Sequence, residues 1–593
     1  MLRGIGTSGG IGIGHVLLIS GMKADDGKGD EPGAVDEPFD ATVQKELYDN
    51  ARQQFIDNTN SMIDSLKAKL NGDDNTALIL KNQIYLADDE ELIKNVHECI
   101  ENDNMTAVSA IRQVCDMYAG MFASMDSEVM RQRAADVEDV RDRLLSILTG
   151  SESVDLSSLP DGTVIVADEL RPSITANMDT EHVVGIVAMK GGETSHAAIL
   201  ARALEIPAVL SVADICSSVC DGDDIIVDGE YGEVFVRPLD KTLAIYRKKK
   251  LRYDERIEEL KQYIDKDTKT RDGERFCLAA NIGNDKDCSK AMSLGAEGVG
   301  LFRTEFFFLE GNSMPSEETQ FEAYKRAAVL AKGKFVTIRT LDIGGDKDIP
   351  YMGLVKESNP FLGYRAIRYC LGRVDVFITQ LKAIIRASAY GNIRIMIPLV
   401  TNVDEVVSTK KIISDICKDF DRKEIPYDKN IQVGVMIETP AAAMIADILA
   451  TKVDFFSIGT NDLTQYTMAV DRGNENVAYL YSVYNPAVLR SIRHIISCAR
   501  QAGIEVGMCG EAAANPGMIP LLISFGLDEF SVSPSRILET RKNIAGWTRK
   551  EADSVANNVM LLETEKEVAN YLNDYISAKT EKERSSNENI SVS

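Results

Sequence analysis

A histidine in a glycine-rich turn is the first candidate for chemistry in this sequence. His196 follows Gly191–Ser195 and precedes Ala197–Leu204, a run of strong helix formers that Thr194 and Ser195 are placed to cap. The free N–H groups at a helix N-terminus stabilise anions, and a neutral imidazole is a nucleophile near neutral pH. The pattern predicts that His196 carries a phosphoryl group, while a merely capping or buried histidine is the alternative. The other histidines lack such surroundings: His15, His97, His182 and His494.

Arginines follow hydrophobic, strand-like runs in the second half of the chain. Arg303 and Arg339 each stand at the end of such a run. Because a guanidinium can bind phosphate through two parallel hydrogen bonds, this pair could clamp a phosphate group. Arg365 and Arg472 are further candidates for the same site.

Two carboxylates stand in similar positions. Glu438 and Asp462 each follow a hydrophobic run. Two carboxylates together with substrate oxygens suit Mg²⁺, which prefers hard oxygen ligands and keeps part of its water. Each acid could instead cap the helix that follows it, but the two together favour a magnesium site.

Cys509 ends a further run, in the segment Gly507–Glu511. An unperturbed thiol has a pKa of about 8.5, so it is mostly protonated at neutral pH and can act as a proton donor. An inert buried cysteine is the alternative, and it is the expectation for the other nine cysteines.

The elements that must position these residues follow from the hydrophobic pattern. Beyond residue 270, eight strand-like runs alternate with helical ones, which predicts a (β/α)8 barrel with its active site at the carboxyl ends of the strands. The runs are Phe276–Ala280, Gly298–Phe302, Phe335–Arg339, Ile393–Leu399, Ile431–Ile437, Phe455–Ile458, Glu505–Met508 and Glu529–Val532.

The first half of the chain predicts a second α/β unit with an insertion. Residues 1–21 indicate one or two strands, residues 41–149 have helical spacing, and short β-branched runs return after residue 160. We therefore expect a swivelling β/α domain interrupted by an all-α domain, with a charged helix over Asp240–Asp265 as the connector to the barrel.

The expected boundaries describe a multidomain α/β protein. Residues 1–22 and 151–238 form the β/α domain, 23–150 the helical insert, 239–269 the linker helix, 270–575 the barrel, and 576–593 a polar, frayed tail. The acidic stretch from Lys23 to Asp40 is expected to be a loose loop.

Composition restricts the classes of partner. The 593 residues carry a formal charge of −26, which repels nucleic acid and anionic membranes but could attract a basic protein, or could simply keep the protein soluble. The ten cysteines form no regular framework, and no run of 18 apolar residues occurs, so we expect a cytoplasmic protein. Cys216 and Cys220 lack a second ligand pair for zinc.

Over residues 1–575 the sequence resembles Enzyme I of the bacterial phosphoenolpyruvate-dependent sugar phosphotransferase system. The resemblance is carried by specific motifs: Gly191–His196, Arg133-Ala134-Ala135-Asp136, Gly344-Gly345-Asp346-Lys347, Asn359–Gly363, and the segments around Arg303, Arg339, Glu438, Asn461-Asp462 and Cys509.

The resemblance implies roles for these positions. His196 would be phosphorylated by phosphoenolpyruvate (PEP), Glu438 and Asp462 would bind Mg²⁺, and Cys509 would protonate the enolpyruvate carbon. The helical insert would dock the phosphocarrier HPr, and the barrel would form a homodimer. The residues expected to bind PEP are Arg303, Arg339, Asn461, Asp462, Arg472, Arg365 and Lys347.

Three positions depart from the family pattern: Gly9-Gly10 replaces a Pro-Gly turn, Glu193 replaces a frequent arginine, and Gln83 replaces a frequent histidine of the insert.

Two alternative functions are that of an ATP-dependent PEP-utilising relative and that of a non-catalytic scaffold. The absence of a Gly-Lys-Ser/Thr phosphate loop argues against the first, and the retained polar set argues against the second. Because the sequence opens on the predicted β/α strand, we expect the sugar-uptake branch.

Overall fold

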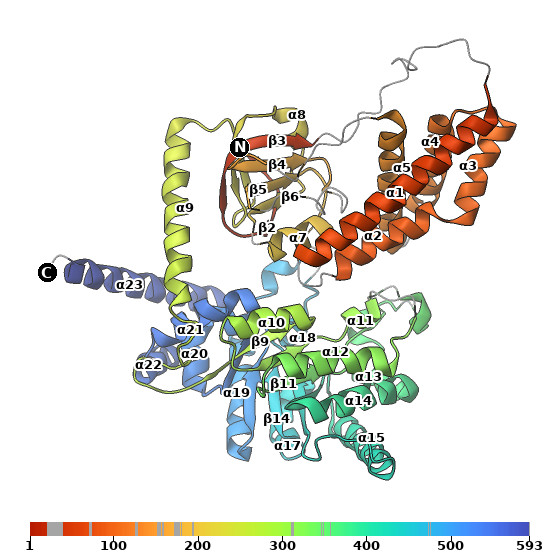
Figure 1. Ribbon diagram of the computed structural model, residues 1–593. Helices are drawn as coiled ribbons and strands as arrows, with labels where there is room; N and C mark the ends of the chain where they lie inside the picture. Colours follow the sequence, from red (N-terminus) through yellow and green to blue (C-terminus); the bar gives the residue numbers. More distant parts are fainter. Residues whose placement is uncertain are drawn as a thin grey trace. The chain divides into compact units, whose positions relative to one another are not determined.

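The computed structural model describes residues 1–19, 39–69, 74–124, 128–150, 156, 159–170, 178, 181–192, 195–204, 206–309, 313–345, 347, 349–355, 357–472, 474 and 476–591. The chain forms two compact units, Met1–Ile257 and Glu258–Ser593, and each is described by itself (Figure 1). None of the helices in the described part of the chain combines the length and the apolar composition that a membrane crossing requires.

The first unit contains an eight-stranded sheet with the order β1-β8-β7-β3-β4-β5-β6-β2. Strand β3 pairs with β4 in parallel and with β7 in antiparallel orientation, so the start of the chain completes a sheet formed mainly by later residues. The N-terminal segment holds three strands where one or two were predicted. The strands are β1 Leu2–Arg3, β2 Ile5–Ser8, β3 Ile11–Ile19, β4 Thr163–Ala167, β5 Val183–Ala188, β6 Ala208–Leu210, β7 Asp224–Asp228 and β8 Glu233–Val236.

Between β3 and β4 the chain forms a helical block, as predicted (Figure 1). Its core contains Tyr48 and Phe55, which are seven residues apart and therefore share one face of a helix, packed with Ile111 and Leu144 of later helices. The predicted acidic loop lies outside the described residues up to residue 38. The helices are α1 Ala41–Lys69, α2 Asp74–Ala87, α3 Glu90–Asn102, α4 Ala107–Ala123 and α5 Glu128–Thr149.

Among the described residues after β4, the chain forms helices α7 His196–Ala203, α8 Ile215–Ser218 and α9 Asp240–Lys261. The predicted charged helix over Asp240–Asp265 is present as α9 but ends at Lys261, and the division between the two units falls inside it.

The second unit is a closed barrel of eight parallel strands, which confirms the predicted fold. All eight predicted runs form strands in the expected order, because strands buried on both faces read as continuous apolar runs. They are β9 Cys277–Ile282, β10 Val299–Phe302, β11 Val336–Arg339, β12 Ile393–Ile397, β13 Gln432–Ile437, β14 Phe455–Ile458, β15 Glu505–Met508 and β16 Glu529–Val532.

Helices surround this barrel, and their ends follow local capping rules. Asn485 caps α19 through its side chain, and Gly503, with a φ of 72°, ends it. The helices are α10 Asp285–Ser293, α11 Phe306–Leu309, α12 Glu317–Leu330, α13 Ile367–Gly372, α14 Val374–Ala387, α15 Val403–Arg422, α16 Pro440–Met444, α17 Ala446–Ala450, α18 Thr460–Met468, α19 Pro486–Ala502, α20 Met518–Phe525, α21 Ile537–Ala545, α22 Arg549–Val559 and α23 Glu565–Ser591.

The end of the chain differs from the prediction of a frayed tail. Helix α23 continues to Ser591. It is anchored near its middle, where Tyr575 stacks on Trp547 and Lys579 lies 3.6 Å from the centre of the Trp547 ring. The aromatic and cation–π contacts explain why helix extends beyond the last barrel strand.

A buried arginine ties the segment after α9 to the barrel. Arg541 in α21 donates hydrogen bonds to the carbonyls of Tyr263 (2.8 Å) and Gly295 (2.5 Å) and to the hydroxyl of Thr268 (3.0 Å). We expect Arg541→Met to lower the free energy of unfolding by about 3 kcal/mol, because several buried carbonyls lose their donor. Urea denaturation followed by Trp547 fluorescence measures it. Arg536→Met, on the surface of the same region, should change it by less than about 0.5 kcal/mol.

Candidate active site

The carboxyl ends of the barrel strands bring most of the predicted site residues to one end of the second unit. Arg303 follows β10, Arg339 ends β11, Glu438 follows β13 and Cys509 follows β15. Asn461 and Asp462 lie in the first turn of α18, directly after β14. In a parallel barrel these strand ends all open on the same face, where active sites of this fold lie.

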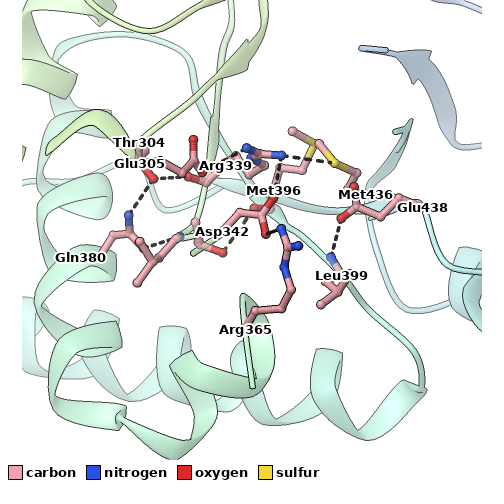
Figure 2. Close-up of polar contacts among 12 residues, drawn as sticks. Thr304, Glu305, Arg339, Asp342, Arg365, Gln380, Met396, Leu399, Met436 and Glu438 are labelled. Carbon is pink, nitrogen blue, oxygen red and sulfur yellow. Dashed lines mark hydrogen bonds and ion pairs between the residues drawn. The ribbon is translucent and has the colours of Figure 1, made fainter. Parts of the chain in front are cut away.

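A chain of buried ion pairs connects the central arginines (Figure 2). Arg339 lies 3.1 Å from Glu305 and 3.0 Å from Asp342, and Asp342 accepts a hydrogen bond of 3.0 Å from Arg365. Only 6% of Arg365 is exposed. The two guanidinium groups hold the pKa of Asp342 below its usual value despite burial. Both arginines therefore stay charged in a dry site.

Both arginines retain unused donors. The Nε of Arg339 and the Nε and Nη1 of Arg365 are buried and have no hydrogen-bond partner among the described residues. A buried donor without a partner costs about 1–3 kcal/mol. An anionic ligand that accepts these hydrogen bonds would recover that energy, so these two side chains are a candidate anion site.

The end of β11 is held by uncharged groups (Figure 2). Gln380 in α14 accepts a hydrogen bond from the N–H of Leu341 (2.8 Å) and donates one to the hydroxyl of Thr304 (3.2 Å). Thr304 in turn donates to the carbonyl of Arg339 (3.0 Å). These bonds fix the backbone from which the arginine side chain extends.

The predicted metal ligands are both strongly perturbed acids. Glu438, only 2% exposed, accepts a hydrogen bond of 2.6 Å from the N–H of Leu399. Burial and the nearby Asp462 and Asp342 raise the pKa of Glu438 well above its usual value. Burial and Asp342 likewise raise the pKa of Asp462. Such carboxylates are stabilised by a nearby cation, so their chemistry fits Mg²⁺.

The protein alone does not enclose a metal in the described residues, where no group of three or more His, Cys, Asp or Glu side chains could hold one. Two carboxylates and additional oxygens from a substrate remain compatible with the site, because Mg²⁺ is commonly bound by one or two carboxylates plus phosphate oxygens.

Four further residues were predicted for this site. Arg303, Arg472 and Lys347 are exposed, and Arg472 is near enough to lower the pKa values of Asp342 and Asp462. Asn461 is half-buried, and its side-chain oxygen accepts a hydrogen bond of 3.4 Å from the backbone N–H of Glu511. The structure therefore separates a dry pair, Arg339 and Arg365, from solvated basic groups.

Cys509 lies in an apolar layer inside the barrel. It packs with Leu301, Met396, Met436 and Phe455, and its thiol is 3.8 Å from the carbonyl of Ile458. Burial raises the pKa of the Cys509 thiol to about 11. The thiol is consequently protonated at neutral pH, as a proton donor must be.

His196 lies in the other unit, as the first residue of α7. The hydroxyl of Ser195 accepts a hydrogen bond of 3.3 Å from the N–H of Ala198, which confirms the predicted cap. Thr194 and Glu193 lie outside the described residues. His196 and the residues of the barrel site therefore belong to different units.

Four residues of the barrel site were not predicted from the sequence: Thr304, Glu305, Asp342 and Gln380. Asp342 had a usable signal, since a carboxylate three residues after a candidate phosphate-binding arginine, in the loop after the same strand, suggests an ion pair. Gln380 had no such signal, because it reaches β11 from a helix about 40 residues away in sequence.

The class of protein follows from comparison with family models. Residues 257–549 match the PEP-binding domain of PEP-utilising enzymes, residues 159–232 match their mobile domain, and residues 3–133 match their N-terminal domain. The three models together cover both units, so the chain is a PEP-utilising enzyme.

Full-length relatives define the family more narrowly. The phosphoenolpyruvate-protein phosphotransferase of Staphylococcus aureus (strain MSSA476) is 41% identical over 94% of this chain and 99% of its own. Those of Staphylococcus epidermidis (40% identical, 97% and 99% coverage) and Geobacillus stearothermophilus (45%, 84% and 86%) are also similar. This chain belongs to the phosphoenolpyruvate-protein phosphotransferase family, the Enzyme I family that the motifs indicated.

The ion-pair chain predicts that Asp342 controls substrate affinity. Asp342→Asn keeps the shape but removes the charge between two arginines, so we expect PEP to bind at least about tenfold more weakly. Isothermal titration calorimetry measures this affinity. Asp375→Asn, which removes a similar charge beside Arg373 on the surface, is the matched control and should bind PEP normally. Equal affinities of the two variants would contradict the assignment.

Proposed function

We propose that this enzyme transfers the phosphoryl group of PEP to His196, releases pyruvate, and passes the group to a histidine of the phosphocarrier HPr, as the first step of sugar uptake. The observation that carries the proposal is the buried pair Arg339 and Arg365, whose unused donors lie beside two perturbed carboxylates in the PEP-binding domain. Full-length similarity to phosphoenolpyruvate-protein phosphotransferases supports the overall reaction.

PEP carries a phosphate and a carboxylate, which suits a site with several basic groups. Arg339 and Arg365 supply buried donors, and Arg303, Arg472 and Lys347 add charge at the edge. The side-chain amide of Asn461 supplies neutral hydrogen bonding. Asp462 would contribute by holding Mg²⁺, because a bare carboxylate would repel the substrate.

Glu438 and Asp462 would hold Mg²⁺. When bound, the ion neutralises charge on the phosphate oxygens and on the leaving enolate. The two side chains set its position at the ends of β13 and β14.

The remaining chemistry uses residues of this chain. A ring nitrogen of His196 attacks the phosphorus in line, the bond from phosphorus to the enol oxygen breaks, and the phosphorylated ring lies at the positive end of α7. Cys509 gives its thiol proton to the methylene carbon of the enolate, which yields pyruvate. The thiolate then recovers a proton from water.

Because His196 and the barrel site belong to different units, we infer that His196 alternates between PEP and the carrier by a swivel about α9. We place the moving domain at 1–22 and 151–238, the insert at 23–150, the linker at 239–269 and the barrel at 270–575. A reducing cytoplasm suits the enzyme, since all ten cysteines are free thiols.

The helical insert is the proposed docking site for HPr. Met117 and Met121, one helical turn apart on α4, are 57% and 47% exposed, and Tyr85 on α2 is also exposed. Exposed large apolar side chains of this kind are typical of protein interfaces, and the charge of −26 favours a basic carrier. Gln83 is buried and hydrogen-bonded to Asp139 (2.9 Å), so its effect on docking would be indirect.

The barrel also presents apolar surface suited to the proposed homodimer. Met444 on α16 and Ile448 on α17 are exposed one helical turn apart in sequence, and Tyr479 is exposed in the segment between α18 and α19. A second copy of the barrel that covers these side chains would remove them from water.

The first test concerns the nucleophile. His196→Ala should reduce pyruvate release coupled to HPr phosphorylation below detection, because no other group accepts the phosphoryl from PEP. A coupled dehydrogenase assay measures pyruvate. His494→Ala, at an exposed histidine of α19, should retain wild-type activity, and chelation of Mg²⁺ should silence both.

Unchanged turnover by the His196 variant would overturn the proposed nucleophile. Labelling of His196 from radioactive ATP but not from PEP would instead assign the chain to the ATP-dependent relatives.

The second test separates docking from loading. The double variant Met117→Ser/Met121→Ser should raise the KM for HPr about tenfold or more, because it removes exposed apolar contact area, while phosphorylation of His196 by PEP stays unchanged. Steady-state kinetics at varied HPr measures the change. Leu561→Ser, an exposed apolar residue of the barrel unit, is the control. An unaltered KM in the double variant would move the docking site elsewhere.

A further inference from the structure

A buried acid lies inside the barrel at the opposite end of the strand pair from Cys509. Glu529, the first residue of β16, is 6% exposed. A Cβ placed on Gly300 would lie 2.0 Å from Glu529 Oε1 and 2.4 Å from Ser531 Oγ, and one on Gly507 would lie 3.1 Å from Glu529 Cδ. The two glycines therefore leave the space that the side chains of Glu529 and Ser531 fill, and these two polar groups are neighbours.

Ser531 continues this contact toward the active site. Its hydroxyl donates a hydrogen bond of 2.7 Å to Asn281 Oδ1. The amide nitrogen of Asn281 donates to the carbonyl of Cys509 (2.9 Å) and to the carbonyl of Ser531 (3.2 Å). Ser531 and Asn281 thus form a hydrogen-bonded polar column that ends on the backbone of Cys509, and Glu529 lies beside Ser531.

The polar column supplies hydrogen bonds to Cys509 at the point where the pairing between β15 and β16 ends. The ladder between β15 and β16 ends at the pair Met508 and Phe530, so the carbonyl of Cys509 lies just beyond it. On the other side, the N–H of Cys509 donates to the carbonyl of Ile458 (3.2 Å). The backbone of Cys509 is therefore held on one side by β14 and on the other by the side chain of Asn281.

We propose that Asn281, held in place by the hydroxyl of Ser531, is the positioning residue that aims the Cys509 thiol at the carbon it protonates. The inference rests on the proposed function, in which Cys509 is the proton donor. Without these hydrogen bonds the end of β15 could rotate. The Cys509 thiol would then shift away from the carbon that it protonates, and a small shift is enough to impair proton transfer. Burial and the nearby Glu505 raise the pKa of Glu529 to about 8, so the acid is mostly neutral at neutral pH and adds little charge below the thiol.

The stereochemistry of protonation tests the proposal directly. PEP labelled stereospecifically with deuterium at C3 is converted in tritiated water, and the configuration of the methyl group of pyruvate is determined. Wild-type enzyme should protonate one face. Asn281→Ala should give largely racemic pyruvate with a kcat lowered about tenfold or more and a KM for PEP within about twofold, because enolpyruvate is still formed but is protonated in solution.

Controls separate positioning from stability and from the proposed function. Asn284→Ala removes the side-chain cap of α10 three residues away and should keep stereospecific protonation. Cys509→Ala should be racemic; if it stays stereospecific, the role of Cys509 in the proposed function fails instead.

Should Asn281→Ala not fold, Ser531→Ala decides the question, because it removes only the hydroxyl that orients Asn281. Partial loss of stereospecificity with an unchanged KM is expected. Stereospecific protonation at a wild-type rate in Asn281→Ala or in Ser531→Ala, together with a racemic Cys509→Ala, would overturn the positioning role.

Discussion

The ion pairs of Asp342 with Arg339 and Arg365 are the interaction on which the barrel site depends. Burying an unpaired guanidinium costs several kcal/mol, so two such groups can stay inside the protein only if acids neutralise them. Asp342 contacts both, and Glu305 contacts Arg339 from the other side. These ion pairs leave N–H groups of Arg339 and Arg365 without a partner among the described residues, and an anionic substrate could accept hydrogen bonds from them.

The two perturbed carboxylates complete the balance of charge. Glu438 and Asp462 gain protons more readily than ordinary acids, because burial and repulsion from neighbouring carboxylates, Asp342 among them, raise their pKa values. A divalent cation would remove that penalty, and in the proposed function Glu438 and Asp462 would hold it. Beside them, the apolar layer around Cys509 keeps the thiol protonated. The proposal thereby assigns an anion clamp, a cation site and an acid to one end of the barrel.

Much of this arrangement could be predicted from sequence, for a physical reason. The barrel strands are mostly apolar, so a charged residue directly after a strand stands out in the sequence, as at Arg303 and Glu438. Contacts between side chains of distant elements leave no such mark: Gln380 on Thr304, and Asn281 on Cys509, join residues 76 and 228 positions apart. The extra N-terminal strand and the helical C-terminus were missed because short edge strands and polar helices have weak hydrophobic patterns.

His196 belongs to one unit, whereas the PEP-binding domain belongs to the other. Mass spectrometry of the intact protein tests this division of labour most directly. After incubation with PEP and Mg²⁺, the account predicts one acid-labile phosphate, located at His196 and lost when HPr is added. A phosphate that is stable to acid, lies on another residue, or persists in the presence of HPr would contradict it.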